Sequence, residues 1–332
     1  MSSPSAAIHE FSLIRRLAAL LSSPKPQQSF TGIGDDASVL RLASTHYQLA
    51  THDMLLEGVH FVRGTLADFR ALGWKALAVN LSDIAAMGGR PQQALIGLGL
   101  PKGTRRQEVE ALYKGLQECA RKYNCPILGG DTNRSQKDWV IAVTVLGNSK
   151  KAPLLRSGAK PGESLWVTGK LGSAALGWKL IQKNDRSRLG ARFRFSHQKP
   201  LPRLDWGERF LASGLVSAMI DLSDGLGGDL CHLAEVSRVG FEIEIEKIPR
   251  EKNFEVLCKK NHLSELSLML SGGEDYELLL TVKAGQEKNF QNFIARHRIE
   301  AHYIGRATSS RKIIFREAGK KISAKINGYT HF

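Results

Sequence analysis

Apolar residues recur at helical spacing over residues 8–21 and again over residues 68–88. In the second stretch, one face of the predicted helix carries Leu72, Ala76, Val79, Asp83 and Met87. Asp68 is suited to cap the N-terminus of this helix. Asp83 therefore falls on the apolar side, where an unpaired carboxylate is costly unless a proton, a cation or a metal neutralises it.

Short apolar runs between turn residues predict strands elsewhere in the chain. We expect a hairpin over residues 37–43 and 46–55, and strands over 91–101, 125–131, 139–147, 164–169, 241–246, 276–282 and near 303 and 313. We expect further helices over 105–123, 173–183, 203–213, 251–260 and 286–297 and after residue 228, and a basic segment up to Pro202. A Gly- and Pro-rich stretch that begins near residue 156 predicts a domain boundary near residue 150. The sequence thus predicts two α/β domains of the α+β type, 1–150 and 151–332.

Acidic residues interrupt the apolar runs repeatedly. In GIGDDASVL, residues 32–40, two adjacent aspartates precede an apolar run, and similar interruptions occur in THDML, NLSDI, LGGDT, IDLSDG and SGGED. A single aspartate of this kind is usually a turn residue. Six such interruptions favour a shared site, and oxygen ligands without Cys or His clusters indicate Mg²⁺ or Ca²⁺ rather than zinc. The twelve-residue calcium loop of EF-hands is absent from the sequence.

The composition is that of an ordinary globular protein, with 42% hydrophobic and 24% charged residues. The cysteines are widely spaced, which indicates neither a zinc site nor a disulfide framework: they are Cys119, Cys125, Cys231 and Cys258. No stretch of 18 apolar residues and no secretory signal is visible, so we expect a cytoplasmic protein.

The net charge is +15, and residues 151–332 hold 30 basic against 20 acidic residues, compared with 17 against 12 in residues 1–150. Such a surface can attract nucleic acid or phosphorylated small molecules, or simply be solvated. No RNA-binding signature or helix-turn-helix accompanies it, so nucleic-acid binding is the weaker interpretation. The P-loop pattern and the nucleophile-elbow pattern are both absent from the sequence.

Eight motifs in order carry a resemblance to a known family: GIGDDA, EGVHF, GWKALAVNLSDIAAMGGRP, GGDT, RSGAKPGE, IDLSDGL, SGGEDYELL and GYTHF. From about residue 10 to Phe332 the chain resembles the thiamine-monophosphate kinases, within the aminoimidazole ribonucleotide synthetase superfamily. The resemblance implies an N-terminal ATP/Mg-binding domain that pairs strands across a homodimer. It also implies a C-terminal α/β sandwich domain that completes the nucleotide and thiamine phosphate site.

The implied reaction transfers the γ-phosphoryl group of ATP to thiamine monophosphate, by Mg²⁺-assisted direct transfer without a protein nucleophile. By similarity, the ligands of several Mg²⁺ ions are Asp36, Thr51, Asp53, Asp83, Asp131, Asp221 and Asp224. The resemblance assigns to ATP the residues Tyr113, Gly130, Asp131, Arg156 and Ser223. It assigns to thiamine phosphate the residues His60, Glu274 and Tyr329.

One departure from the family pattern is His52, which precedes Asp53 where family members usually have a hydroxyl residue. We expect its imidazole beside the Asp53 metal site. Two superfamily rivals fit less well, because a selenophosphate synthetase would have an N-terminal Cys and a hydrogenase maturation dehydratase would end in a reactive Cys. A non-catalytic basic protein that binds phosphate or nucleic acid is the alternative from another class.

Overall fold

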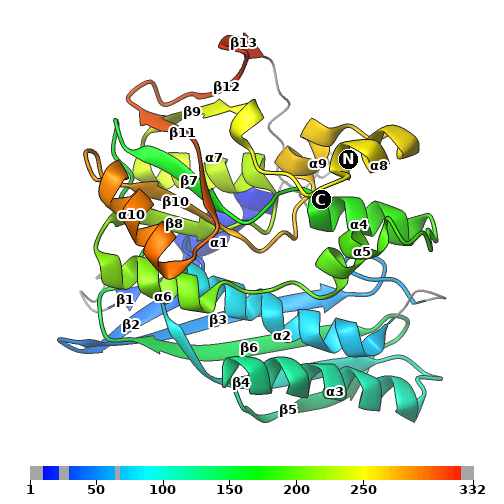
Figure 1. Ribbon diagram of the computed structural model, residues 1–332. Coiled ribbons are helices and arrows are strands. Elements are labelled where there is room, and N and C mark those ends of the chain that lie inside the picture. The colour runs from blue at the N-terminus through cyan, green and yellow to red at the C-terminus, as the bar shows by residue number, and fades with distance from the viewer. Residues whose placement is uncertain (1–9, 22–29, 64–67, 323–332) are drawn as a thin grey trace, which may run out of the picture.

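The structure, a computed structural model, describes residues 10–21, 30–63 and 68–322 (Figure 1). Helix α1 (Glu10–Leu21) opens the chain. The strands of the first sheet are β1 (Phe30–Thr31), β2 (Ser38–Ala43), β3 (His46–Leu56), β4 (Arg90–Leu100), β5 (Ile127–Arg134) and β6 (Val140–Ser149). Their order across the sheet is β1-β2-β3-β6-β4-β5, so β5 forms one edge.

Helices α2 (Phe69–Ala86) and α3 (Arg106–Tyr123) cover one face of this sheet (Figure 1). The Asp68 side chain accepts hydrogen bonds from the backbone N–H groups of Arg70 and Ala71, as predicted for the N-cap. Helix α2 is buried on nearly all sides, because it lies between the first sheet and elements of the second half. No helix of the described residues packs on the other face of the sheet, which exposes Leu40, Met54 and Leu95.

The second half surrounds a seven-stranded sheet in the order β13-β12-β9-β11-β7-β10-β8. Its strands are β7 (Ser164–Thr168), β8 (Val216–Asp221), β9 (Gly240–Glu244), β10 (Leu278–Val282), β11 (Ala301–Thr308), β12 (Ile313–Glu317) and β13 (Lys320–Ile322). Its α-helices are α4 (Ser173–Gln182), α5 (Ala191–Gln198), α6 (Leu204–Ser213), α7 (Leu226–Ser237), α8 (Phe254–Asn261), α9 (Glu265–Ser271) and α10 (Glu287–His297). None of the helices in the described ranges is both long and apolar enough to cross a bilayer.

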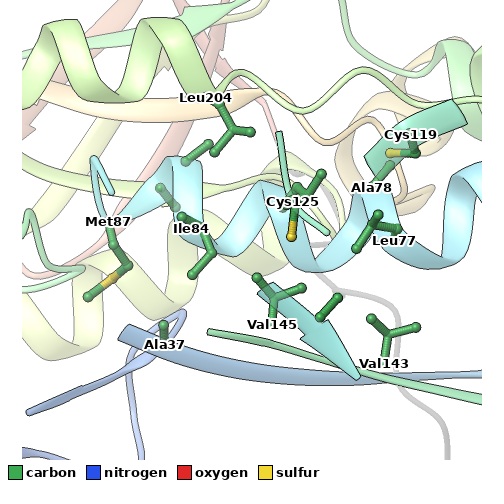
Figure 2. Close-up of a cluster of buried hydrophobic side chains, with 14 of the residues drawn as sticks. Ala37, Leu77, Ala78, Ile84, Met87, Cys119, Cys125, Val143, Val145 and Leu204 are labelled. Atoms are coloured by element: carbon green, nitrogen blue, oxygen red, sulfur yellow. The ribbon is translucent and has the colours of Figure 1, made fainter. Parts of the chain in front are cut away.

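One of two hydrophobic clusters spans both halves, and the other lies within the second half. Leu77, Ile84 and Val145 of the first half pack in the same cluster as Leu204 and Phe210 of α6 (Figure 2 shows part of this cluster). Because close-packed side chains resist displacement, this shared core holds the two sheets at a defined separation. The cleft between them is therefore preformed.

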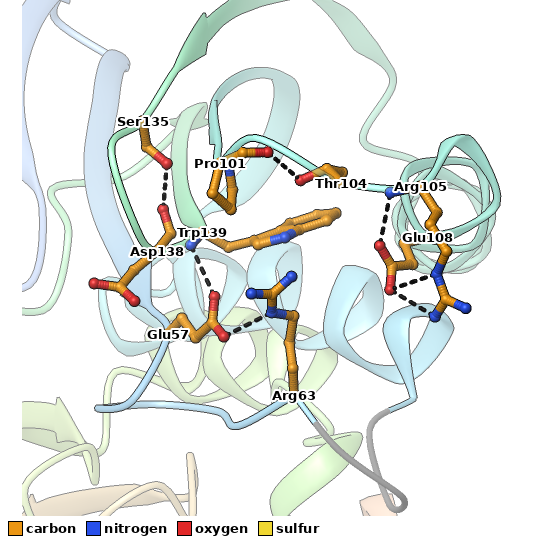
Figure 3. A network of polar contacts seen from close by, with 9 residues as sticks. All are labelled: Glu57, Arg63, Pro101, Thr104, Arg105, Glu108, Ser135, Asp138 and Trp139. Atoms are coloured by element: carbon orange, nitrogen blue, oxygen red, sulfur yellow. Dashed lines mark hydrogen bonds and ion pairs between the residues drawn. The ribbon is translucent and has the colours of Figure 1, made fainter.

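A polar network holds the segment that follows β3 (Figure 3). One carboxylate oxygen of Glu57 accepts from the backbone N–H of Trp139 at 3.0 Å, and the other accepts from Arg63 at 2.7 Å. The Glu57 backbone N–H donates to the Trp139 carbonyl at 3.0 Å. This network fixes the turn that carries His60.

The predicted α/β class is confirmed, and most predicted elements occur within a few residues of their expected bounds. The basic segment before Pro202 contains helix α5, which was not expected. Helix α9 and strand β13 were not expected either. These elements are short, and short helices depend on tertiary packing rather than on their own sequence pattern.

Candidate active site

A cleft of about 1600 Å³ lies between the two halves. The first half lines it with residues of the turn before β2, strand β3 and helix α2, and α1 borders it through Ala18 and Leu21. The second half contributes Arg156, the turn after β8 and the segment 272–276. The volume exceeds the roughly 300–1,000 Å³ of pockets for one small ligand, so two phosphorylated ligands fit.

Three predicted metal ligands meet at the floor of this cleft. One carboxylate oxygen from each of Asp36, Asp83 and Asp221 lies within 4.8 Å of the others. They come from separate elements, because Asp36 follows the turn at Gly34, Asp83 lies in α2 and Asp221 ends β8. The Ser82 hydroxyl donates to Asp221 Oδ2 at 2.7 Å and orients that carboxylate.

These carboxylates are poorly compensated by the protein. Burial and repulsion from Asp36 raise the pKa of Asp221 to about 8. Burial, followed by repulsion from Asp53, raises the pKa of Asp83 well above its ordinary value. Asp36 Oδ2 is buried and has no hydrogen-bond partner among the described residues. Clustered oxygen donors with an orphaned buried oxygen fit a hard divalent cation.

Arg156 is the one cation of the protein that contacts this cluster in the described cleft. Its Nη2 and Nε donate to Asp36 Oδ1 at 2.6 and 3.1 Å, and its backbone N–H contacts both Asp35 oxygens at 3.2 Å. Burial, together with repulsion from Asp36, raises the pKa of Asp35 to about 7. The guanidinium thus lies at the rim of the acidic floor, 22% exposed toward the cleft.

The other predicted ligands of β3 also reach the floor. The Thr51 hydroxyl donates to Asp83 Oδ2, and the Asp53 backbone N–H donates to the buried Asn80 at 3.1 Å. The His52 side chain lies on the opposite face of β3 from Thr51 and Asp53. Its Nδ1 lies 2.8 Å from the hydroxyl oxygen of Thr144 on β6. His52 therefore borders the cleft but hydrogen-bonds away from the Asp53 carboxylate.

Ser223 and Asp224 lie in the cleft wall on the turn between β8 and α7. The Asp224 backbone N–H donates to the buried Asp229 carboxylate at 3.2 Å, and Asp229 was not predicted from the sequence. His60 and Glu274 also line the cleft. Tyr329 lies outside the described residues.

Three side chains near Glu274 were missed by the sequence analysis. Lys75 and His197 bind its carboxylate oxygens, and Trp178 stacks on the His197 ring with centroids 4.8 Å apart. Lys75 offered a signal, since it is a lysine inside the apolar stretch GWKALAVNL. His197 and Trp178 offered no such signal.

Tyr113, Gly130 and Asp131 do not join the cleft of the same chain. Asp131 on the edge strand β5 is aligned with Gly97, Ala142 and Met54 across the sheet. Three strand spacings of about 4.8 Å separate it from β3 by about 14 Å. Directly paired residues share a face, so Asp131 shares the open face with Met54, whereas Thr51 faces α2.

Family comparisons agree with this architecture. Residues 34–148 match the family model described as AIR synthase related protein, N-terminal domain, and residues 160–317 match the corresponding C-terminal domain. The chain is 34% identical to the thiamine-monophosphate kinase of Aquifex aeolicus, covering 90% of this chain and 92% of the relative. It is 33% identical to that of Bacillus subtilis, covering 91% and 93%.

A solved structure described as AaThiL complexed with AMPPCP and TMP superposes with a TM-score of 0.86 at 32% identity, covering 99% of this chain and all of the other. These relatives match nearly the full length, and the predicted family is confirmed. The chain belongs to the thiamine-monophosphate kinase family, with the two domains of the AIR synthase-related proteins.

Proposed function

We propose that the protein transfers the γ-phosphoryl group of ATP to thiamine monophosphate, giving thiamine diphosphate and ADP. The observation that carries this proposal is the convergence of Asp36, Asp83 and Asp221 on the floor of a cleft lined by both halves. The cleft is large enough for a nucleotide and a second phosphorylated ligand. The family relationship of the chain agrees with ATP and thiamine monophosphate as that pair of substrates.

Mg²⁺ is the cation that this oxygen-rich floor fits best. The residues that would hold it are Asp36, Thr51, Asp53, Asp83, Asp221 and Asp224. When bound, Mg²⁺ neutralises the charge that keeps two anionic phosphates apart. The raised pKa values of Asp83 and Asp221 support this assignment, because a cation removes their mutual repulsion.

The transfer forms a bond between a phosphate oxygen of thiamine monophosphate and the γ-phosphorus, and it breaks the bond from that phosphorus to the bridging oxygen of ADP. No protein nucleophile is needed. Arg156, held on Asp36 at the rim, is suited to bind phosphate oxygens of ATP, and Ser223 offers a hydroxyl from the opposite wall.

The thiamine end of the cleft carries His60 and Glu274. The backbone N–H of Leu56 donates to His60 Nδ1 at 3.1 Å, so the proton of the neutral ring resides on Nε2. His60 can then donate a hydrogen bond to thiamine monophosphate, while Glu274 offers negative charge to its cationic ring. Tyr329 would complete this end by similarity.

The protein acts as a homodimer in this proposal, with the open face of the first sheet against a second copy. That face exposes apolar side chains, with Leu40, Met54 and Leu95 at 37, 47 and 42%. Apolar surface of this extent favours association. Strand β5 with Gly130 and Asp131, and helix α3 with Tyr113, would then reach the ATP end of the partner's cleft. Asp131 lies about 14 Å from β3 of its own chain.

Complementation tests this shared site. Asp83→Asn and Asp131→Asn proteins are each expected to have little activity, and equal amounts of the two are mixed under conditions of subunit exchange. A heterodimer has one site with both changes and one intact site, so about a quarter of wild-type activity returns. No recovery after verified exchange would show that Asp131 acts on its own chain, and light scattering that finds an active monomer would exclude the dimer.

The reaction itself is tested by following ATP-dependent conversion of thiamine monophosphate in Mg²⁺ and in EDTA. We expect thiamine diphosphate in the first case and none in the second. Binding of both ligands without turnover would favour the alternative, a non-catalytic basic phosphate- or nucleic-acid-binding protein. We further propose a cytoplasmic location and a domain division near residue 150.

A further inference from the structure

Lys75 is a charged residue inside helix α2, which is buried on nearly all sides. Its side chain is 2% exposed. The ammonium group lies 2.6 Å from Glu274 Oε1, 3.2 Å from the His60 carbonyl oxygen and 3.5 Å from His197 Nε2. Three N–H donors thus face three acceptors, which is the arrangement that a buried ammonium requires.

Glu274 is held from two sides. Oε1 contacts Lys75, and Oε2 lies 2.8 Å from His197 Nδ1. Because an ammonium can only donate, His197 Nε2 is the acceptor toward Lys75. The proton of the neutral ring therefore resides on Nδ1, in close polar contact with Glu274 Oε2. Burial, aided by the charge of Lys75, lowers the pKa of His197, in agreement with a neutral ring.

The charge of Glu274 is fixed by the same contacts. Burial raises its pKa, but attraction to Lys75 and the polar contact with His197 outweigh burial, so the pKa lies below its ordinary value. Asp275 and Tyr276 are the other titratable groups that interact with it. Glu274 is therefore a carboxylate at every pH at which the enzyme is assayed.

The loop that carries Glu274 is also constrained. Gly273, Glu274 and Tyr276 all adopt positive φ, at 66°, 62° and 51°. Non-glycine residues rarely adopt this conformation unless their surroundings impose it. The Glu274 N–H donates to the Ser223 carbonyl at 2.8 Å, which joins this loop to the turn after β8.

The contacts of Lys75 connect two residues of the proposed thiamine end that come from different halves. It binds the backbone of His60 in the first half and the carboxylate of Glu274 in the second. A buried ion pair whose only role is stability is weak, since apolar residues often replace it without loss. Its location between two cleft residues indicates a role in their placement.

We infer that Lys75 and His197 are positioning residues for thiamine monophosphate: Lys75 sets the separation of His60 and Glu274, and His197 sets the orientation of the Glu274 carboxylate. This inference rests on the function proposed above. It concerns substrate affinity and not the transfer step.

Lys75→Met tests the inference through a separation of the two Michaelis constants. We expect the KM for thiamine monophosphate to rise at least about ten-fold, while the KM for ATP changes less than about two-fold. Without Lys75 the pKa of Glu274 rises, so its charge is lost as the pH falls through that higher value. The variant's kcat/KM for thiamine monophosphate therefore falls between pH 8 and pH 6 more steeply than that of the wild type.

A second variant separates placement from folding. Lys75→Met combined with Glu274→Gln removes the uncompensated buried charge, so we expect the Tm to recover while the KM for thiamine monophosphate remains high. If the Tm and the KM for thiamine monophosphate both return to wild-type values, the role of Lys75 is purely structural. His197→Asn keeps an N–H donor and should retain more affinity than His197→Leu, and Lys288→Met on the exposed face of α10 is the control.

Two failures are distinguishable. If the wild-type enzyme does not phosphorylate thiamine monophosphate, the proposed function is wrong. If it does, but Lys75→Met binds thiamine monophosphate in a calorimeter as tightly as the wild type and has the same pH profile, the positioning role is wrong.

Discussion

The two ends of the cleft treat buried charge in opposite ways. At the acidic floor, burial and like-charge repulsion raise the pKa values of Asp83 and Asp221. At the proposed thiamine end, Glu274 has its own cation in Lys75 and a pKa below its ordinary value. Lys75 and Asp83 belong to the same helix, α2, eight residues apart.

This difference indicates where each end finds its counter-charge. At the proposed thiamine end, the counter-charge of Glu274 is Lys75 of the same chain, so no ion from solution is needed there. Within the described part of the chain, the acidic floor has only Arg156 against several carboxylates. A cation from solution would supply the missing charge, in agreement with the metal site proposed above.

The largest expected effect tests the acidic floor. Asp83→Asn and Asp221→Asn should each lower kcat by about 100-fold or more, because each removes charge from the group that gathers the cation. Both variants should remain folded by circular dichroism. Asp205→Asn, an exposed acid in α6, is the matched control, and turnover of either test variant at the wild-type rate would contradict the metal assignment.

The next prediction concerns the sign of stability changes along α2. In EDTA, Lys75→Met should destabilise the protein by about 3–5 kcal/mol, because it leaves the Glu274 charge buried and unpaired. Asp83→Asn should instead raise the Tm in EDTA, because it relieves repulsion among the carboxylates.

Thermal unfolding with and without Mg²⁺ measures both effects. Mg²⁺ should raise the Tm of the wild type and of Lys75→Met, but raise that of Asp83→Asn much less. If Lys75→Met and Asp83→Asn both lower the Tm in EDTA, the two ends of the cleft do not differ in how their buried charges are compensated.

A smaller effect is expected from Tyr329, which lies outside the described residues. An aromatic face against the cationic thiazolium can contribute roughly 1–2 kcal/mol. Tyr329→Ala should therefore raise the KM for thiamine monophosphate by about ten-fold and leave that for ATP nearly unchanged. Tyr329→Phe is the control that keeps the ring. Equal weakening for both substrates with a large fall in Tm would assign Tyr329 to the core.

The smallest effect is expected at His52. Its ring contacts Thr144 and not a carboxylate of the floor, so His52→Thr should change the Mg²⁺ affinity by less than about three-fold, an ordinary value for a surface substitution. Calorimetric titration at constant pH measures this. A larger change in Mg²⁺ affinity would support the expectation from the sequence, in which the His52 imidazole lies beside the metal site at Asp53.

Several features of the site could be predicted because their signals are local. Asp68 and the apolar spacing after it identified α2, and the acids that interrupt apolar runs identified Asp36, Asp83 and Asp221 as candidates. The order of eight motifs identified the family. The apolar spacing alone could not predict which way the Asp83 side chain faces. Helix α2 is buried on nearly every side, so it has no polar face from which the direction of the core could be inferred.

The sequence by itself therefore determined the class of elements, the family and the residue types of the candidate metal site, because propensity, periodicity and motifs act over short stretches of chain. Only the tertiary structure decided which side chains share an environment. Lys75, His197 and Glu274 meet from three distant segments, and Asp131 is separated from the other acids by strand order and sheet face. The charge state of each group follows from these distances and from burial, which no local pattern records.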